Sequence, residues 1–306
     1  MYGCPYELIF NSAHLLPKLR RDPRFAYRPG VIVQRVVETG EGVAVCGIDK
    51  ATGRPLRFAG QRAYLGAGVV NSTRIVLESL EAYDTPLEMA DSCYFLVPWV
   101  TARGSRAVTS EPLHTLAQLF FEILDPAIST HTVHLQLYTY NDLYIGAIRK
   151  LLGPAYRALR PLLDGVLGRL HILQGYLHST ESPSIQVRLT GRGDQSALVL
   201  TSRGATREHR ARIGAVLSKL WRHRRHLGGC PIAPMLNIAD PGRGFHGGGT
   251  IPMRREPRPF QCDILGRPYG FRRLHLVDAT AFPTIPATTI TLSVMANAHR
   301  IGSASP

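Results

Sequence analysis

The sequence lacks any long hydrophobic run and has few cysteines. It contains no stretch of about 18 apolar residues, which excludes a helix that spans a bilayer. The first ten residues, MYGCPYELIF, lack the charged and then apolar order of a secretory signal, so we predict a cytoplasmic chain. The five cysteines are irregularly spaced without a CxxC pair. This predicts reduced thiols, and neither a metal site nor a redox pair.

Acidic residues are scarce beside basic ones. The sequence has 36 Lys and Arg against 22 Asp and Glu, a net charge of +14. Only Lys18, Lys50, Lys150 and Lys219 are lysines, so arginine supplies the rest. This balance permits attraction to phosphates, nucleic acid or an anionic membrane. The arginines are scattered, however, and their densest cluster, Arg222–Arg225, stands at the expected end of a helix, where it complements the helix dipole. We therefore do not expect nucleic acid as a partner.

The first part of the chain reads as strands followed by one helix. The segments VIVQRVVE, GVAVCGID and PLRF, between Tyr27 and Phe58, alternate apolar and polar residues, which predicts an antiparallel meander. Residues 63–65 predict a strand that turns on Gly66, Ala67 and Gly68 into a helix capped by Asn, Ser or Thr at 71–73. Such a turn can present backbone N–H groups to phosphate, although this signal alone is weak.

In the middle of the chain, apolar and polar residues alternate with period two in three segments, which predicts strands. These segments begin at His131, Ser184 and Ser196. Between the first two lies a helical pattern that Pro154 and Pro161 are expected to break. Its apolar stripe, accompanied by arginine and lysine, fits either contact with a membrane surface or burial against a sheet. A further helix is predicted from Thr206 to the Gly-Gly pair at 228–229.

Two C-terminal stretches contain the candidate chemistry. In the first, His246 is followed by three glycines and Thr250, which places an imidazole on a backbone that a ligand can approach closely. In the second, an apolar strand ends at Asp278 and a proline-containing loop leads to a helix that starts near Thr288 or Thr289. The amides at the start of this helix suit an anionic or electron-accepting ring. Four apolar residues of the helix are expected to pack inward: Leu292, Met295, Ala296 and Ile301.

One glycine pattern matches a dinucleotide-binding motif in its letters but not in its context. Gly242, Gly244 and Gly247 satisfy GxGxxG as letters, but they do not lie between a strand and a helix. No acidic residue follows about twenty positions later in a βαβ unit. We reject this pattern as a dinucleotide-binding fingerprint.

The segment HGGGTIPM, from His246 to Met253, resembles the His-x-x-Gly-Thr-x-x-Met motif of the glucose–methanol–choline (GMC) family of flavin-dependent oxidoreductases. The segment HLVDATAFPT with TLSVMANAHRI resembles the closing part of that family, and YLGAGVVNSTRIVLESL resembles its internal strand–turn–helix element. The opening GCPYELIFNSA is closest to the bacterial sterol- and alcohol-oxidising branch. Three matches in the right order are more specific than any one of them.

The resemblance implies FAD-dependent oxidation of the CH–OH group of an alcohol or a sterol-like substrate. His246 would take the hydroxyl proton while hydride passes to the flavin. The family often has a second polar catalytic residue, and here Thr289 occupies that place, although a hydroxyl is a poor base. The resemblance also implies a set of FAD-binding residues: Val33, Gly66, Ala67, Gly68, Asp278, Ala279 and Thr288.

The implied fold is α/β with α+β character. An incomplete FAD/NAD(P)-binding Rossmann-like domain would comprise residues 1–92 and 240–306. A substrate-binding domain with a mostly antiparallel sheet and flanking helices would comprise residues 93–239. The N-terminal βαβ fingerprint of the family is absent, so we expect a C-terminal portion of a GMC enzyme that is inactive alone. It would be a truncated gene product, a product of a misplaced start codon, or half of a split pair whose N-terminal half another chain supplies. The alternative is a non-catalytic basic remnant or binding protein associated with a membrane or nucleic acid.

Overall fold

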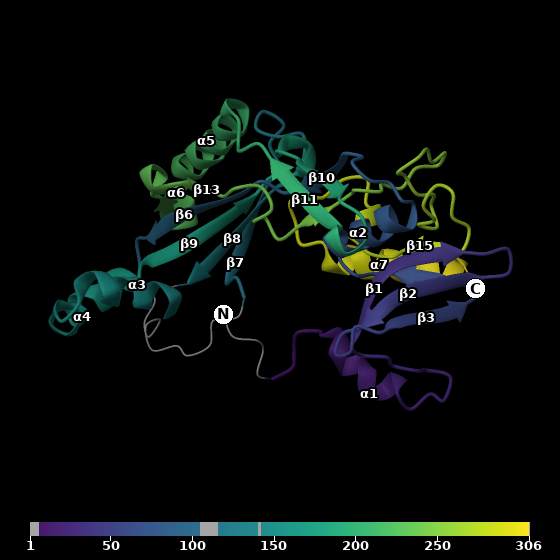
Figure 1. Ribbon diagram of the computed structural model, residues 1–306. Helices are drawn as coiled ribbons and strands as arrows, with labels where there is room; N and C mark the ends of the chain where they lie inside the picture. Colours follow the sequence, from purple (N-terminus) through teal and green to yellow (C-terminus); the bar gives the residue numbers. More distant parts are fainter. Residues whose placement is uncertain (1–5, 105–115, 140–141, 306) are drawn as a thin grey trace. The chain divides into compact units, whose positions relative to one another are not determined.

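The computed structural model describes residues 6–104, 116–139 and 142–305 (Figure 1). Cys4 and the first residues of the opening segment GCPYELIFNSA lie outside the described residues. The chain divides into two compact units, each assembled from three segments. Unit 1 comprises residues 1–27, 95–175 and 210–238, and unit 2 comprises residues 28–94, 176–209 and 239–306. Most of the predicted substrate-binding range lies in unit 1, whereas residues 176–209 lie in unit 2.

Unit 1 contains a sheet with strand order β12-β6-β9-β8-β7, and β13 pairs with β6. Alternation along the central strands places apolar side chains such as Phe95, Val97 and Trp99 in the core, where each is at most 1% exposed. The strand bounds are β6 (Tyr94–Thr101), β7 (Leu119–Ile123), β8 (Val133–Thr139), β9 (Leu170–Tyr176), β12 (Gly229–Pro231) and β13 (Asn237–Ile238).

The helices of unit 1 are α1 (Leu16–Leu19), α3 (Asp142–Leu152), α4 (Ala155–Leu167), α5 (Arg207–Arg222) and α6 (Arg224–Leu227), where α5 has its first turn in unit 2. Pro154 separates α3 from α4 as predicted, but Pro161 lies inside α4. The predicted break at Pro161 was therefore wrong. Proline removes one backbone hydrogen bond of the helix. The helix continues through Pro161, and beyond it Leu163 and Leu167 pack in one apolar cluster.

Unit 2 begins with the predicted antiparallel meander, formed by β1 (Val31–Glu38), β2 (Val43–Asp49) and β3 (Pro55–Gly60). The strand β4 (Ala63–Leu65) then turns into α2 (Val69–Ser79), as the sequence predicted. The prediction of a polar cap at 71–73 was wrong, because the helix begins after Gly68 without a side-chain cap. Ser72 and Thr73 are fully buried within the helix and bond to other parts of unit 2.

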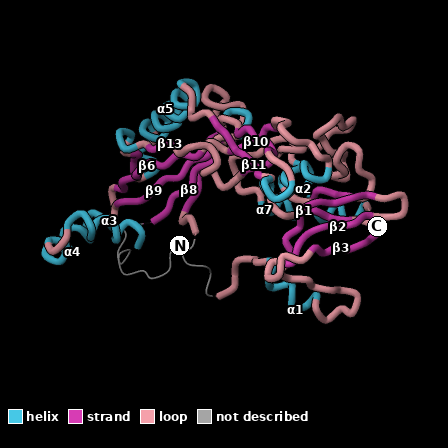
Figure 2. Tube along the Cα trace, in the orientation of Figure 1, coloured by secondary structure: helices cyan, strands magenta, loops and turns pink. Residues whose placement is uncertain are grey.

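Two more sheets complete unit 2. The strands β5 (Leu87–Asp91), β10 (Ile185–Thr190), β11 (Ala197–Ser202) and β14 (Gly247–Gly248) form a sheet in the order β11-β10-β5-β14. The strand β15 (Leu274–Leu276) pairs in parallel with β4. Figure 2 shows β10 and β11 among the strands, which are magenta, and the loops in pink. The mixed helix and mostly antiparallel sheet content agrees with the predicted class.

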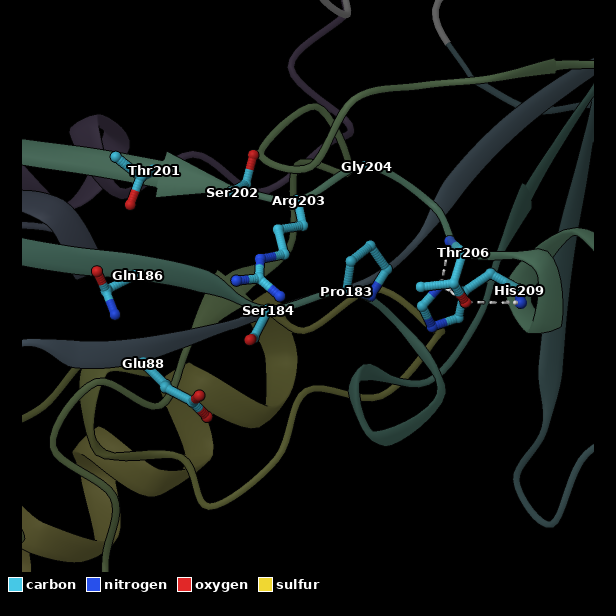
Figure 3. Close-up of a pocket in the computed structure, with 10 residues that line it drawn as sticks. All are labelled: Glu88, Pro183, Ser184, Gln186, Thr201, Ser202, Arg203, Gly204, Thr206 and His209. Atoms are coloured by element: carbon cyan, nitrogen blue, oxygen red, sulfur yellow. Dashed lines mark hydrogen bonds between the residues drawn. The ribbon is translucent and has the colours of Figure 1, made fainter.

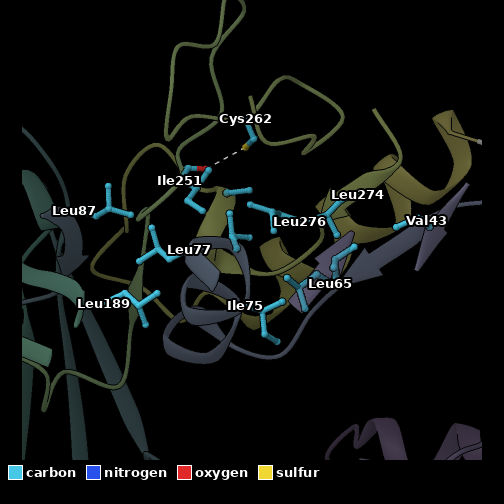
Figure 4. Packing of buried hydrophobic residues seen from close by; sticks show 13 residues of the cluster. Val43, Leu65, Ile75, Leu77, Leu87, Leu189, Ile251, Cys262, Leu274 and Leu276 are labelled. Atoms are coloured by element: carbon cyan, nitrogen blue, oxygen red, sulfur yellow. Dashed lines mark hydrogen bonds between the residues drawn. The ribbon is translucent and has the colours of Figure 1, made fainter. Parts of the chain in front are cut away.

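A single apolar cluster joins α2 to the strands of unit 2 (Figure 4). It collects residues from distant segments because β4 and β15 lie side by side beneath the apolar side of α2, which carries Ile75, Val76 and Leu77. The fully buried members from the C-terminal part are Ile251, Cys262, Leu274, Leu276 and Ala281. This packing fixes the two C-terminal stretches on α2 and β4.

The last helix, α7, spans Thr291–Ala304, so it starts two to three residues later than predicted. Ile301 is buried as expected, but Leu292 is 78% exposed and Met295 is 40% exposed. Ala296 is exposed as well. The prediction that these three residues pack inward was wrong, because helical periodicity identifies an apolar stripe without identifying a partner that covers it.

Candidate functional site

The turn between β4 and α2 is fastened to Asp278 at the end of β15. The Asp278 carboxylate accepts hydrogen bonds from Gly68 N–H at 2.9 Å, from the Ser72 hydroxyl at 2.5 Å and from Thr280 N–H at 3.0 Å. Parallel pairing of β4 with β15 brings the two strand ends to the same edge. The structure thus brings together the predicted turn and Asp278, which is only 8% exposed.

The turn itself is open. Gly66, Ala67 and Gly68 are exposed, and Gly68 adopts φ 82°, a left-handed value that glycine tolerates. A Cβ at Gly68 would meet nothing within 4 Å. The turn therefore leads into the N-terminus of an eleven-residue helix with accessible backbone, the kind of surface that suits an anionic group.

The His246 segment is attached to β5. Gly247 and Gly248 form β14 and pair with Asp91 and Ala90. Farther along, the Thr250 hydroxyl contacts the Thr73 hydroxyl of α2 at 2.6 Å. The His246 motif is thus held by β5 on one side and by α2 on the other.

One aromatic ring contacts the candidate base, and a second ring packs against that ring. The rings of His246 and Tyr176 have centroids 5.2 Å apart, and Tyr176 stacks on Tyr94 at 5.1 Å. Phe245 contacts Tyr94 edge-on at 5.7 Å. His246 is half-buried, and its Nδ1 atom is buried. The contact with the Tyr176 ring restricts the orientation of the imidazole.

The loop before α7 packs beside the same segment. Gly249 N–H donates to the Ala279 carbonyl at 2.9 Å, and Ile251 N–H donates to the Thr280 carbonyl at 3.1 Å. Ala279 is 7% exposed and shares an apolar cluster with Ile290 at the start of α7. Thr288 is half-buried and Thr289 is exposed. The His246 segment and the loop with both threonines therefore form one packed region of unit 2.

A groove of about 450 Å³ is shared by these two segments. Gly249 and Thr250 line it from the His246 segment, and Pro283 and Thr284 line it from the loop before α7. The candidate base His246 is outside the described lining of this groove. Of the remaining predicted residues, Val33 lies on β1 and its side chain packs against the core of unit 2.

A second hollow, of about 540 Å³, lies beside the ends of β5, β10 and β11 (Figure 3). Most of its side chains are polar, and the Thr206 hydroxyl lies 3.1 Å from Nδ1 of His209 at one end. The lining consists of Glu88, Pro183, Ser184, Gln186, Thr201, Ser202, Arg203, Gly204, Thr206 and His209. It contains none of the site residues predicted from the sequence.

Sequence reasoning missed three contributors to this region. Asp91, Tyr94 and Tyr176, which all belong to unit 2, contact the His246 loop. No local pattern marks them, because their role depends on pairing between segments far apart in the chain. Ser72 was noticed only as a helix cap, whereas its hydroxyl in fact binds Asp278.

The sequence matches no protein-family model, and no curated protein matches it. Its structure resembles solved structures. Pyridoxine 4-oxidase from Mesorbium loti matches with a TM-score of 0.60 at 16% identity, over 90% of this chain and 57% of that chain. An FAD-dependent oxidoreductase from Chaetomium thermophilum matches with a TM-score of 0.56 at 13% identity, over 94% of this chain and 62% of that chain. A fungal aryl-alcohol oxidase matches with a TM-score of 0.51 at 13% identity, over 89% of this chain and 60% of that chain.

These neighbours are FAD-dependent oxidoreductases of the GMC family. At such low identity, the likeness establishes a shared fold. The chain spans about three fifths of the length of each neighbour.

Proposed function

We propose that this chain contributes the alcohol-oxidising site of a GMC-type, FAD-dependent oxidoreductase. The observation that carries the proposal is the clustering in unit 2 of three segments far apart in sequence: the glycine turn at 66–68, Asp278, and the segment from His246 to Thr250. The same three segments suggested the family from the sequence. The shared fold supports this reading independently of those motifs.

The residues present fit FAD. The open backbone of Gly66, Ala67 and Gly68 and the amides at the start of α2 would hold its diphosphate. The Asp278 charge is compensated by three hydrogen-bond donors, which reduces its repulsion of a nearby phosphate. We further assign contacts with FAD to Ala279, Thr288 and the backbone of Val33. When bound, FAD supplies a two-electron acceptor for hydride.

In this proposal His246 removes the hydroxyl proton of the substrate. Nε2 accepts it, because Nδ1 is buried. The C–H bond of the carbon that bears this hydroxyl breaks, and its electron pair leaves with the hydrogen as hydride. The alcohol becomes a carbonyl compound. The exposed Thr289 hydroxyl donates a hydrogen bond to the substrate oxygen, and the imidazolium later returns its proton to water. The proposed substrate class is an alcohol or a sterol-like molecule.

We propose that a dinucleotide-binding βαβ segment outside these 306 residues completes the FAD site, and an N-terminal half supplied by another chain is one way to provide it. The 306 residues contain no βαβ fingerprint, so the turn at 66–68 would hold only part of the cofactor. The test measures alcohol-dependent loss of visible flavin absorbance, without oxygen, for the chain alone and with a dinucleotide-binding partner. We expect the alcohol to reduce the flavin only when the partner is present. The His246→Gln variant should lose this reduction, whereas His299→Gln, a change at an exposed position, is the control and should retain it. Tight, stoichiometric FAD in the isolated chain would contradict the need for a partner.

The second candidate function is binding to an anionic membrane surface, and it rests on an apolar stripe of α4. Leu159, Leu162 and Val166 are 40%, 71% and 56% exposed, although another side of α4 already packs through Leu163 and Leu167. Residues 149–169 contain five cations and one acid, Asp164. An exposed apolar stripe on a basic helix suits the surface of an anionic bilayer. In the described residues, no helix is long and apolar enough to cross a membrane.

Vesicle flotation tests this second candidate. We expect the chain to float with vesicles that contain phosphatidylglycerol and to be released by salt. Leu162→Glu should weaken binding roughly tenfold or more, because it places a charge where a side chain enters the interface. Leu124→Glu, a change at another exposed leucine of unit 1, is the matched control. Equal flotation of both variants would contradict a role for α4.

A further inference from the structure

We propose that Asp91 is the positioning residue for His246. The inference rests on the proposed role of His246 as the base. Asp91 is the last residue of β5 and is only 3% exposed. A buried carboxylate at a strand end requires hydrogen-bond donors, and the described donors come from the loop that carries His246 and from the backbone next to Asp91.

Asp91 holds this loop at two points. Its Oδ2 atom accepts a hydrogen bond from Gly242 N–H at 2.6 Å. Its backbone lies opposite Gly247 in the antiparallel pairing of β5 with β14. Only residues 243–246 lie between the two attachment points, so His246 directly precedes the second one. A span this short has few ways to reorient without breaking one of the attachments.

The residues between the attachments are confined as well. A Cβ at Gly244 would clash with the carbonyl oxygen of Ser92 and would lie 3.0 Å from Oδ1 of Asp91. Phe245 has φ 62°, a left-handed value that costs free energy for a residue with a side chain. This conformation directs the backbone back toward β5 just before His246. Release of Gly242 would therefore let the loop relax and would move the imidazole away from Tyr176.

Ser92 extends the same arrangement to the loop before α7. Its hydroxyl donates to the Pro286 carbonyl at 3.0 Å. The end of β5 thus fastens the His246 loop through Asp91 and the loop that leads to Thr288 and Thr289 through Ser92. Burial raises the pKa of Asp91, and hydrogen bonds from the Gly242 and Ser92 amides oppose this rise. Those amides favour the charged acceptor, which forms stronger hydrogen bonds than a neutral one.

Hydrogen–deuterium exchange of the full chain tests the proposal without FAD. In Asp91→Ala, we expect the amides of residues 242–247 to exchange about tenfold faster. Asp91→Leu fills the space of the carboxylate but provides no hydrogen-bond acceptor, so it should show the same faster exchange as Asp91→Ala. This second variant is used if the cavity left by alanine prevents folding. Asp91→Asn retains an acceptor for Gly242 and should restore slow exchange. Asp263→Ala is the matched control, since Asp263 accepts from Leu265 and Arg267 amides in another loop of unit 2.

A second readout separates positioning from a general structural role. The NMR signal of the His246 ring, assigned with His246→Gln, should shift in Asp91→Ala and recover in Asp91→Asn. His275, whose Nδ1 lies 2.9 Å from the Leu265 carbonyl, should keep its signal. Unchanged exchange and an unchanged His246 signal in Asp91→Ala would overturn the proposal. A shifted signal without alcohol oxidation in any variant would contradict the proposed function while supporting the role of Asp91.

Discussion

Ser72 donates a hydrogen bond of 2.5 Å to Asp278, although 206 positions separate the two residues. Ser72 also accepts from Ala67 N–H at 3.1 Å. One buried hydroxyl therefore connects the helix α2, the glycine turn and the end of β15. The candidate cofactor-binding backbone depends on this connection.

Ser72→Ala should loosen the turn at 66–68. The change leaves the Asp278 carboxylate and the Ala67 amide each with one partner fewer, and we expect the free energy of unfolding to fall by about 1–3 kcal/mol. Urea unfolding measures the loss. Ser293→Ala, at an exposed position of α7, should change stability by less than about 0.5 kcal/mol. Equal effects of the two changes would contradict the importance of the Ser72 hydroxyl.

Gly248→Ala and Gly302→Ala should have opposite effects. A Cβ at Gly248 would lie 2.5 Å from both the Ala279 carbonyl oxygen and Cδ1 of Ile285, so we expect a loss of more than about 2 kcal/mol. Gly302 lies in α7 with nothing within 4 Å of an added Cβ. Alanine there should stabilise the chain by about 0.5–1 kcal/mol through helix propensity. Thermal unfolding of both variants checks the signs, and a tolerated Gly248→Ala would argue against the described contact with the loop before α7.

The buried Asp91 should make stability fall as the pH rises. Burial raises its pKa above 3.8 in the folded state, so the unfolded carboxyl loses its proton first. Above 3.8 the folded state binds more protons than the unfolded state, and stability declines until the pH passes the folded pKa. Asp91→Asn has no titrating carboxyl at this position, so its stability relative to wild type should increase as the pH rises above 3.8 and through the raised pKa of Asp91. Urea unfolding at several pH values tests this, and a decrease would contradict it.

Cys262 should resist alkylation. Burial raises the pKa of this thiol to about 12, with a smaller contribution from the nearby Asp263 charge. Its Sγ also donates to the Ile251 carbonyl at 3.1 Å. At about pH 8.5, iodoacetamide should label Cys46 and Cys230, which are half-buried, before Cys262. Mass spectrometry of the peptides measures the order, and early labelling of Cys262 would show that the core of unit 2 opens readily.

Local patterns in the sequence predicted much of the local structure. The meander of β1, β2 and β3 and the step from β4 through glycine into α2 follow from alternation and from turn residues. The attachment of the His246 loop to Asp91 was not predictable, because 151 positions separate Gly242 from that carboxylate. Tyr176 was not predicted either, because its ring contact with His246 joins two residues that lie far apart in the sequence.

The errors also have a physical cause. Leu292 and Met295 follow the same periodicity as Ile301, yet only Ile301 of these three residues is buried. Pro161 is a helix breaker by its chemistry, but α4 continues through it. In both cases long-range packing decided the outcome, and neither spacing nor composition contains that information.

The pairing of β4 with β15 governs when unit 2 can form. During synthesis, β4 leaves the ribosome roughly two hundred residues before its partner, and domains generally fold as whole units. Until the final segment emerges, Leu65 and the apolar side of α2 have no cover from Leu274 and Leu276. A chain that stops before residue 274 would lack both leucines, so the apolar surface that they cover in unit 2 would stay open to solvent.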